Sequence, residues 1–118
     1  ALMWAATGGH AMAIKALLGA GAAVDAKDED GRTALMIAAE NGHAMAIEAL
    51  LEAGAAVDAK DTDGGTALMS AAGDGHAKAI KALLEAGAAV DAKDNDGRLA
   101  LNLAEENKHE EAARLLRQ

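Results

Sequence analysis

The sequence contains no cysteine, proline, phenylalanine or tyrosine, and Trp4 is its only aromatic residue. Without cysteine there is no disulfide framework, no thiolate nucleophile and no cysteine-ligated zinc. The opening residues Ala1–Trp4 lack the basic region and apolar core of a secretory signal, and no apolar run approaches the ~20 residues of a membrane span. We therefore expect a soluble protein without a targeting signal, which is cytoplasmic if it is expressed in a cell.

Basic residues are also scarce. The chain has 11 Lys and Arg against 19 Asp and Glu, which gives a formal net charge of −8 at pH 7. Binding to a phosphate backbone requires clustered Lys and Arg. We therefore expect no nucleic-acid partner and no membrane partner, whereas the excess of acids weakly favours basic partners.

A 33-residue period organises what is present. Asp-Gly pairs begin at Asp30, Asp63 and Asp96, and histidines recur at the same spacing at 10, 43, 76 and 109. The period divides a single domain, 1–118, into units 1–27, 28–60, 61–93 and 94–118. Ala and Leu, both strong helix formers, are abundant. A period of this length predicts an all-α solenoid of stacked units.

Each unit is predicted to form a turn and two helices. In the second unit Thr33 can cap a helix over 34–41, which Gly42 ends. A second helix over 43–53 ends at Gly54. Isolated helices shorter than ~12–15 residues are marginal in water, so the units must stack to be stable.

These residues match a known family. The run Asp30–Leu35, followed by Ala38-Ala39, Gly42-His43 and Leu50-Leu51, resembles the ankyrin repeat, and the resemblance covers the whole chain. It implies an L-shaped stack of about three and a half to four helix–turn–helix units, with short hairpin fingers and a concave groove formed by the first helices. It also implies a protein-binding module without catalytic residues.

The sequence departs from the family pattern in several places. Met36 and Met69 stand where the family has a histidine that ties neighbouring units by hydrogen bonds, and Ala46 and Ala79 stand where it prefers a larger aliphatic residue. The core is therefore expected to be thinner and less rigid. Because the units are nearly identical and filled with alanine, we interpret the sequence as designed or consensus-derived.

The two complete units, Asp28–Lys60 and Asp61–Lys93, differ at only seven positions. One predicted binding surface consists of the varying positions on the turns and first helices. Its residues are Trp4, Thr7, Gly8, Glu29, Arg32, Ile37, Glu40, Asn41, Gly65, Ser70, Gly73 and Asp74. Gly inside a helix costs about 0.5–1 kcal/mol relative to Ala, which is accepted where another backbone or a ligand must come close. The alternative is that these are tolerated surface substitutions.

A second predicted binding surface lies on the second helices. Met12 and Met45 stand one unit apart where Lys or Glu is usual, and Gly19 replaces the acid found at Glu52 and Glu85. Methionine adapts well to interfaces. Scattered surface apolar residues are the alternative interpretation.

The two ends of the array differ. The last unit is rich in charged residues, as a solenoid end that faces water requires. The first unit starts inside its first helix at Ala1–Trp4 and has no such cap. This predicts either burial of that end against another chain or further residues before Ala1.

No catalytic, metal or cofactor site is predicted. The four histidines fall one per unit, a spacing that cannot place them around one ion, so we assign them a structural role. The acidic turn Asp28–Gly31 lacks the flanking ligands of a calcium loop, because Ala26 and Ile37 occupy their positions. Ser70 has no accompanying His–Asp grouping.

Three functions fit these features, and one of them, a structural scaffold without a partner, stays open beside the two that follow. The favoured hypothesis is a non-enzymatic scaffold that self-associates into a symmetric homo-oligomer through the uncapped end, Met12, Met45 and Gly19. The alternative is a monomer that binds a separate protein through its groove and fingers. Its variable residues would then be Trp4, Ile37, Gly65 and Gly73.

Overall fold

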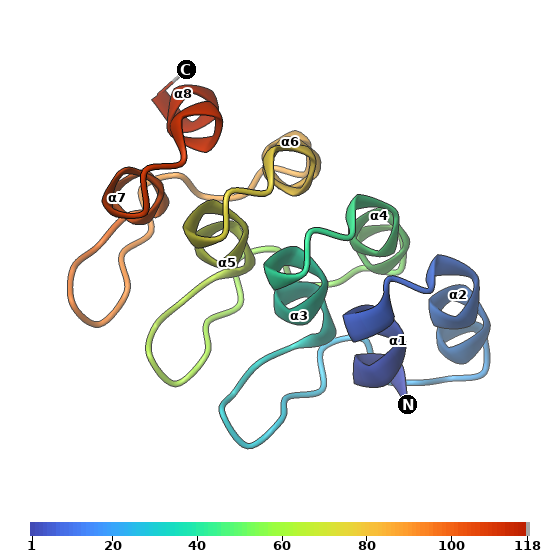
Figure 1. Cartoon of the computed structure of the whole chain (residues 1–118). Helices are drawn as coiled ribbons and strands as arrows, with labels where there is room; N and C mark the ends of the chain where they lie inside the picture. Colours follow the sequence, from blue (N-terminus) through green and yellow to red (C-terminus); the bar gives the residue numbers. More distant parts are fainter. Residues whose placement is uncertain (118) are drawn as a thin grey trace.

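A computed structural model describes residues 1–117, and these fold into helices without strands. The first helices of the units are α1 (Leu2–Gly8), α3 (Ala34–Glu40), α5 (Ala67–Gly73) and α7 (Ala100–Glu106). The second helices are α2 (Ala11–Gly19), α4 (Ala44–Glu52), α6 (Ala77–Glu85) and α8 (Glu110–Arg117). Each set forms one row, and the loops between units project from the side of the first row (Figure 1). The predicted all-α solenoid is confirmed.

The first helices begin and end where the sequence indicates. The Thr33 side chain accepts a hydrogen bond from the Met36 backbone N–H, and Thr66 accepts one from Met69. In the fourth unit Leu99 cannot cap, and its own backbone N–H donates to Asn102 at 2.8 Å instead. Gly42 adopts a φ of +72°, a left-handed conformation that carries the chain from α3 into α4.

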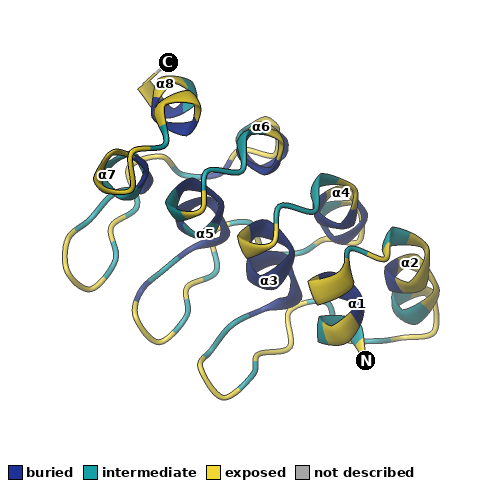
Figure 2. Ribbon diagram, in the orientation of Figure 1, coloured by how far each residue is buried: buried dark blue, intermediate teal, exposed yellow. Residues whose placement is uncertain are grey.

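Alanine allows the rows to pack closely. Ala38 and Ala39 of α3 and Ala71 and Ala72 of α5 are fully buried, and α3 packs against both α1 and α5. Leucine and isoleucine of the second helices complete the core, which runs through the middle of the stack (Figure 2). Stacking therefore buries helices that are too short to be stable alone.

Histidine links neighbouring units. The Nε2 atom of His43 lies 3.0 Å from the Thr7 carbonyl oxygen, and that of His76 lies 2.9 Å from the Glu40 carbonyl oxygen. The His76 ring also lies over Gly42, where a Cβ would approach it to 2.6 Å. These contacts give His43 and His76 a structural role and tie the units together, although Met36 and Met69 stand where the resemblance implies a histidine.

Hydrogen bonds also join the loops of successive units. The Thr62 backbone N–H donates to the Asp30 carbonyl oxygen at 3.1 Å, and the Asn95 N–H donates to the Asp63 carbonyl oxygen at 2.9 Å. The Asp58 carboxylate accepts from the Ala89 N–H at 2.9 Å. Within residues 1–117 no helix is long and apolar enough to cross a membrane.

Candidate functional site

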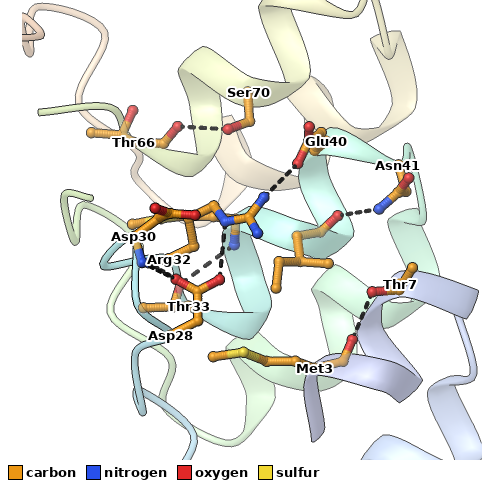
Figure 3. A network of polar contacts seen from close by, with 12 residues as sticks. Met3, Thr7, Asp28, Asp30, Arg32, Thr33, Glu40, Asn41, Thr66 and Ser70 are labelled. Atoms are coloured by element: carbon orange, nitrogen blue, oxygen red, sulfur yellow. Dashed lines mark hydrogen bonds and ion pairs between the residues drawn. The ribbon is translucent and has the colours of Figure 1, made fainter. Parts of the chain in front are cut away.

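The second unit carries an arginine that lies along its first helix. The Nε atom of Arg32 lies 3.0 Å from Asp28 Oδ2, and its Nη1 atom lies 3.6 Å from Glu40 Oε2 (Figure 3). The other Asp28 oxygen, Oδ1, accepts backbone N–H bonds from Asp30 and Arg32, both at 2.9 Å. These backbone bonds fix the carboxylate, so that its second oxygen faces the guanidinium.

The charges of this pair support one another. The hydrogen bond from the Arg32 backbone N–H, above all, lowers the pKa of the Asp28 carboxyl below its usual 3.8. The side-chain hydrogen bond to Asp28 raises the pKa of the Arg32 guanidinium. Both groups are therefore charged at neutral pH.

The fourth unit repeats this arrangement. Arg98 lies 3.1 Å from Asp94, 3.5 Å from Asp96 and 3.7 Å from Glu106. Asp94 Oδ1 again accepts two backbone N–H bonds, from Asp96 at 2.9 Å and from Arg98 at 2.8 Å. In both the second and the fourth unit, the first acid of the unit therefore holds the arginine that follows it by four residues.

The third unit keeps the carboxylate but lacks the arginine. Asp61 Oδ1 accepts N–H bonds from Asp63 at 3.0 Å and Gly65 at 2.8 Å, as Asp28 and Asp94 do from their own neighbours. Gly65 takes the place of Arg32, and Gly73 takes the place of Glu40. Among residues 1–117, Asp61 Oδ2 consequently has no ion-pair partner.

The missing side chains leave a cavity of about 330 Å³ between the second and fourth units. Met69 and Ser70 of α5 and Leu103 of α7 line it together with the two glycines. Its charged lining residues are Glu40, Asp61, Asp63, Asp74, Asp94 and Arg32. Because Arg32 is already paired with Asp28 and Glu40, the cavity presents an excess of negative charge.

Six of the predicted groove residues line this cavity: Arg32, Glu40, Gly65, Ser70, Gly73 and Asp74. Gly65, Ser70 and Gly73 come from one turn and one helix and lie together in its lining. Asn107, from the fourth unit, reaches the same place and donates its Nδ2 hydrogen to the Gly73 carbonyl oxygen at 3.0 Å. The fold therefore brings four of the seven varying positions of the third unit, Gly65, Ser70, Gly73 and Asp74, into a single site.

The remaining predicted groove residues lie elsewhere. Trp4 is 84% exposed on α1, and Thr7 and Gly8 are exposed at the end of that helix. The Thr7 hydroxyl donates to the Met3 carbonyl oxygen at 2.8 Å. Ile37 is only 7% exposed and belongs to the core, so it offers a partner little surface.

The second predicted surface is exposed as expected. Met12 is 81% exposed on α2 and Met45 is 73% exposed on α4. Gly19 is exposed at the end of α2, and a Cβ built there would meet no atom within 4 Å. These residues lie on α2 and α4 of the second-helix row (Figure 1), and none of them lines the cavity.

A polar groove also lies on the last unit, between α7 and α8, and ion pairs within the unit satisfy several of its charges. Arg117 pairs with Glu105 at 2.7 Å, and Arg114 pairs with Glu111. His109 and Lys108 complete its edge. This groove is the charged end surface that the sequence predicts.

Sequence reasoning recognised Arg32 and Glu40 as varying positions but did not pair them. The sequence signal for this ion pair was that both residues are replaced together, by Gly65 and Gly73, in the third unit. An arginine four residues after Asp28 and an acid eight residues further on are both lost in the third unit and both present in the fourth, as Arg98 and Glu106. Leu103 and Asn107 carried no such signal, because they join the site only through the stacking of α7 on α5.

Comparison with known proteins agrees with this architecture. A search of curated proteins found no significant match. The family model described as ankyrin repeats (3 copies) matches residues 1–61 and 53–118, which together span the chain. Ankyrin repeats generally mediate protein–protein interaction and are typically non-enzymatic. The chain therefore belongs to the ankyrin repeat family.

Proposed function

We propose that this domain binds a separate protein through the groove and fingers of its second to fourth units. One observation carries the proposal. The second and third units differ at seven positions, and three of these differences, Arg32/Gly65, Ile37/Ser70 and Glu40/Gly73, all replace a larger residue by a smaller one in a single groove. The result is a cavity where the neighbouring units have a filled surface.

These replacements do not favour stability. Gly73 lies in the last turn of α5, where glycine costs about 0.5–1 kcal/mol relative to alanine. The third unit also forgoes the ion pairs that Arg32 and Arg98 make. A sequence that accepts both losses at one site is better explained by a bound partner than by packing.

The charge of the groove indicates the partner's chemistry. Five carboxylates line the cavity. Glu40 is paired with Arg32 and Asp94 with Arg98, so Asp61, Asp63 and Asp74 supply its excess negative charge, and the chain as a whole carries a net charge of −8. A basic polypeptide segment is attracted to such a surface and is steered towards it at low ionic strength. Polyanions such as nucleic acids are repelled.

Peptide display tests the proposal. Random peptides are selected against the parent domain, and the enriched sequences are then tested against a groove-filled variant, Gly65→Arg with Gly73→Glu. A second variant, Met12→Lys with Met45→Glu, alters the second-helix row and serves as the control. Selected peptides should bind the parent and the control but not the groove-filled variant. Equal binding to all three proteins would contradict the proposal.

Self-association is the second candidate, and the exposed Met12 and Met45 support it. They occupy equivalent positions on α2 and α4, which pack against each other, so they can contribute to one apolar patch. Light scattering after size exclusion distinguishes the two candidates. A monomer has a mass of 11.8 kDa. A dimer that Met12→Lys with Met45→Glu dissociates would favour self-association, whereas a monomer at high concentration would exclude it.

A further inference from the structure

We propose that the groove of the third unit holds an arginine side chain of the bound protein, in the place that Arg32 and Arg98 fill in the neighbouring units. This inference rests on the proposed function, since it names what the partner inserts. It follows from a comparison within the chain. Two units show how the site looks when a guanidinium is present, and one unit shows the same site without it.

The receiving carboxylate is already in position. In each of the three units the first acid has its Oδ1 atom fixed by two backbone N–H groups at 2.8–3.0 Å. In the second and fourth units the free Oδ2 atom contacts the arginine Nε at 3.0 and 3.1 Å. A Cβ on Gly65 would lie 3.3 Å from both oxygens of Asp61, so this carboxylate borders the space that the arginine has vacated.

The residues around Asp61 also suit the guanidinium group of a bound protein. Arg98 contacts three acids, and two of them, Asp94 and Asp96, have counterparts in Asp61 and Asp63. The third, Glu106, corresponds to Gly73, which has no side chain to obstruct entry. Leu103, which is half-buried, supplies apolar surface in the same cavity for the methylene groups of an arginine.

The geometry favours arginine over lysine. The planar guanidinium presents several N–H donors in a rigid fork, and Arg98 uses its Nε, Nη1 and Nη2 atoms on three different carboxylates. An ammonium is a single point charge that cannot reach separated acids in this way. The site should therefore distinguish the two basic side chains, whereas a diffuse acidic surface would not.

The probes are three capped pentapeptides of glycine and serine with a central arginine, lysine or citrulline. Each is titrated into the ¹⁵N-labelled domain at low salt, and amide shifts are followed by NMR. The arginine peptide should shift the amides of Asp63, Gly65 and Gly73 and bind at least about threefold more tightly than the lysine peptide. The citrulline peptide, which keeps the shape but not the charge, should cause no saturable shift.

Two variants and one control test the assignment. Asp61→Asn keeps an oxygen that can accept the two backbone bonds but removes the charge, and it should abolish the preference for arginine. Gly65→Arg with Gly73→Glu rebuilds the pair present in the neighbouring units, and it should fold and lose binding. Glu85→Gln removes an exposed charge at the end of α6, outside the cavity lining, and should leave binding unchanged.

Two results would overturn the arginine site. One is equal affinity for the arginine and lysine peptides, and the other is unchanged binding to the groove-filled variant. These outcomes are distinct from failure of the proposed function. If display-selected peptides depend on the groove but lack arginine, the groove function stands and the arginine site is wrong. If no selected peptide depends on the groove, the proposed function itself fails.

Discussion

Single residues decide the surface of this solenoid because its backbone repeats so closely. Asp28, Asp61 and Asp94 are held by the same backbone hydrogen bonds. An arginine side chain nevertheless fills the space beside Asp28 and Asp94, whereas the space beside Asp61 is empty. The difference lies in the residue four positions later, which is Arg32, Gly65 or Arg98. A repeat fold can therefore acquire a cavity through side-chain loss alone, without any change in its helices.

Gly73→Ala should stabilise the domain by about 0.5–1 kcal/mol, because alanine loses less conformational freedom in a helix. A Cβ at Gly73 meets only Asn107 Nδ2, at 3.9 Å, so space is available. Urea denaturation followed by circular dichroism measures the change. Gly75→Ala is the control two residues away and should destabilise, because Gly75 has a φ of +72° and its Cβ would lie 2.5 Å from the His109 ring. If Gly73→Ala instead lowered the stability of the domain, glycine at this position would be required for folding and not for binding a partner.

The acids that hold arginine should make stability depend on pH. The pKa of Asp28 and that of Asp94 are both lowered from 3.8, chiefly by hydrogen bonds from the backbone N–H groups of Arg32 and Arg98. A carboxyl whose pKa is lower in the folded state stabilises it above pH 3.8 and loses that effect as the pH falls through the folded value.

Asp28→Asn with Asp94→Asn should accordingly be less stable than the parent at pH 7, and the difference should shrink as the pH falls below 3.8. Denaturant midpoints measured from pH 7 to pH 2 follow this convergence. Glu29→Gln, which removes an exposed acid at a finger, is the control for the change in net charge. A difference that stays constant down to pH 2 would show that these carboxyls do not contribute through ionisation.

At the scale of the helices, the turn between the two helices of a unit also joins that unit to its neighbour. The histidine ring of one unit packs against the turn glycine of the unit before it. The ring also hydrogen-bonds to a carbonyl oxygen at the end of that earlier unit's first helix. That carbonyl has no partner within its own helix, because the last turn leaves such groups free. The histidine therefore acts as a helix cap supplied by another unit.

His76→Ala should destabilise the domain by about 0.5–1.5 kcal/mol, the net value of a typical hydrogen bond. The bond from His76 Nε2 to the Glu40 carbonyl oxygen would be lost. His10→Ala is the matched control, since His10 precedes α2 in the same way but lies in the first unit of this chain. Chemical denaturation of both variants gives the comparison. Equal losses would mean that the contribution of histidine is local to its own turn.

The sequence predicts the helices well because each boundary depends on local chemistry. The helix expected over 34–41 is observed at Ala34–Glu40, and Thr33 caps it. Burial at single positions is less predictable. Trp4 and Ile37 are equivalent in the period, yet one is 84% and the other 7% exposed. The difference arises because α3 packs against α1 and α5, whereas α1 packs against α3 alone in its row.

The cavity was predictable only in part for the same reason. Gly65, Ser70 and Gly73 were recognisable as positions where the period breaks, and they do meet in one site. The acids that surround them belong to three units, from Glu40 to Asp94. Their convergence depends on the rise and rotation from unit to unit, which no local sequence signal encodes.

At the scale of the whole molecule, stability should be spread unevenly along the stack. Within residues 1–117 each unit packs mainly against its neighbours, so its stability depends on how much of its surface they cover. In the first unit only Ala5, Ala6 and Ile14 are buried, whereas α3 alone buries six residues. The first unit of this chain should therefore open without disrupting the units in the middle.

Amide hydrogen exchange measures this opening. Amides of α1 and α2 should exchange at least about tenfold faster than those of α3–α6, which corresponds to about 1.4 kcal/mol of local stability. Leu50→Ala, which empties a fully buried position in α4, should cost about 2–5 kcal/mol and lower protection more in the first two units than in the fourth. If every helix instead exchanged at one common rate, the four units would unfold as a single cooperative block. A partner bound at the third unit would then stabilise the whole chain equally, whereas in a graded stack it should protect α5 and its neighbours most and α1 least.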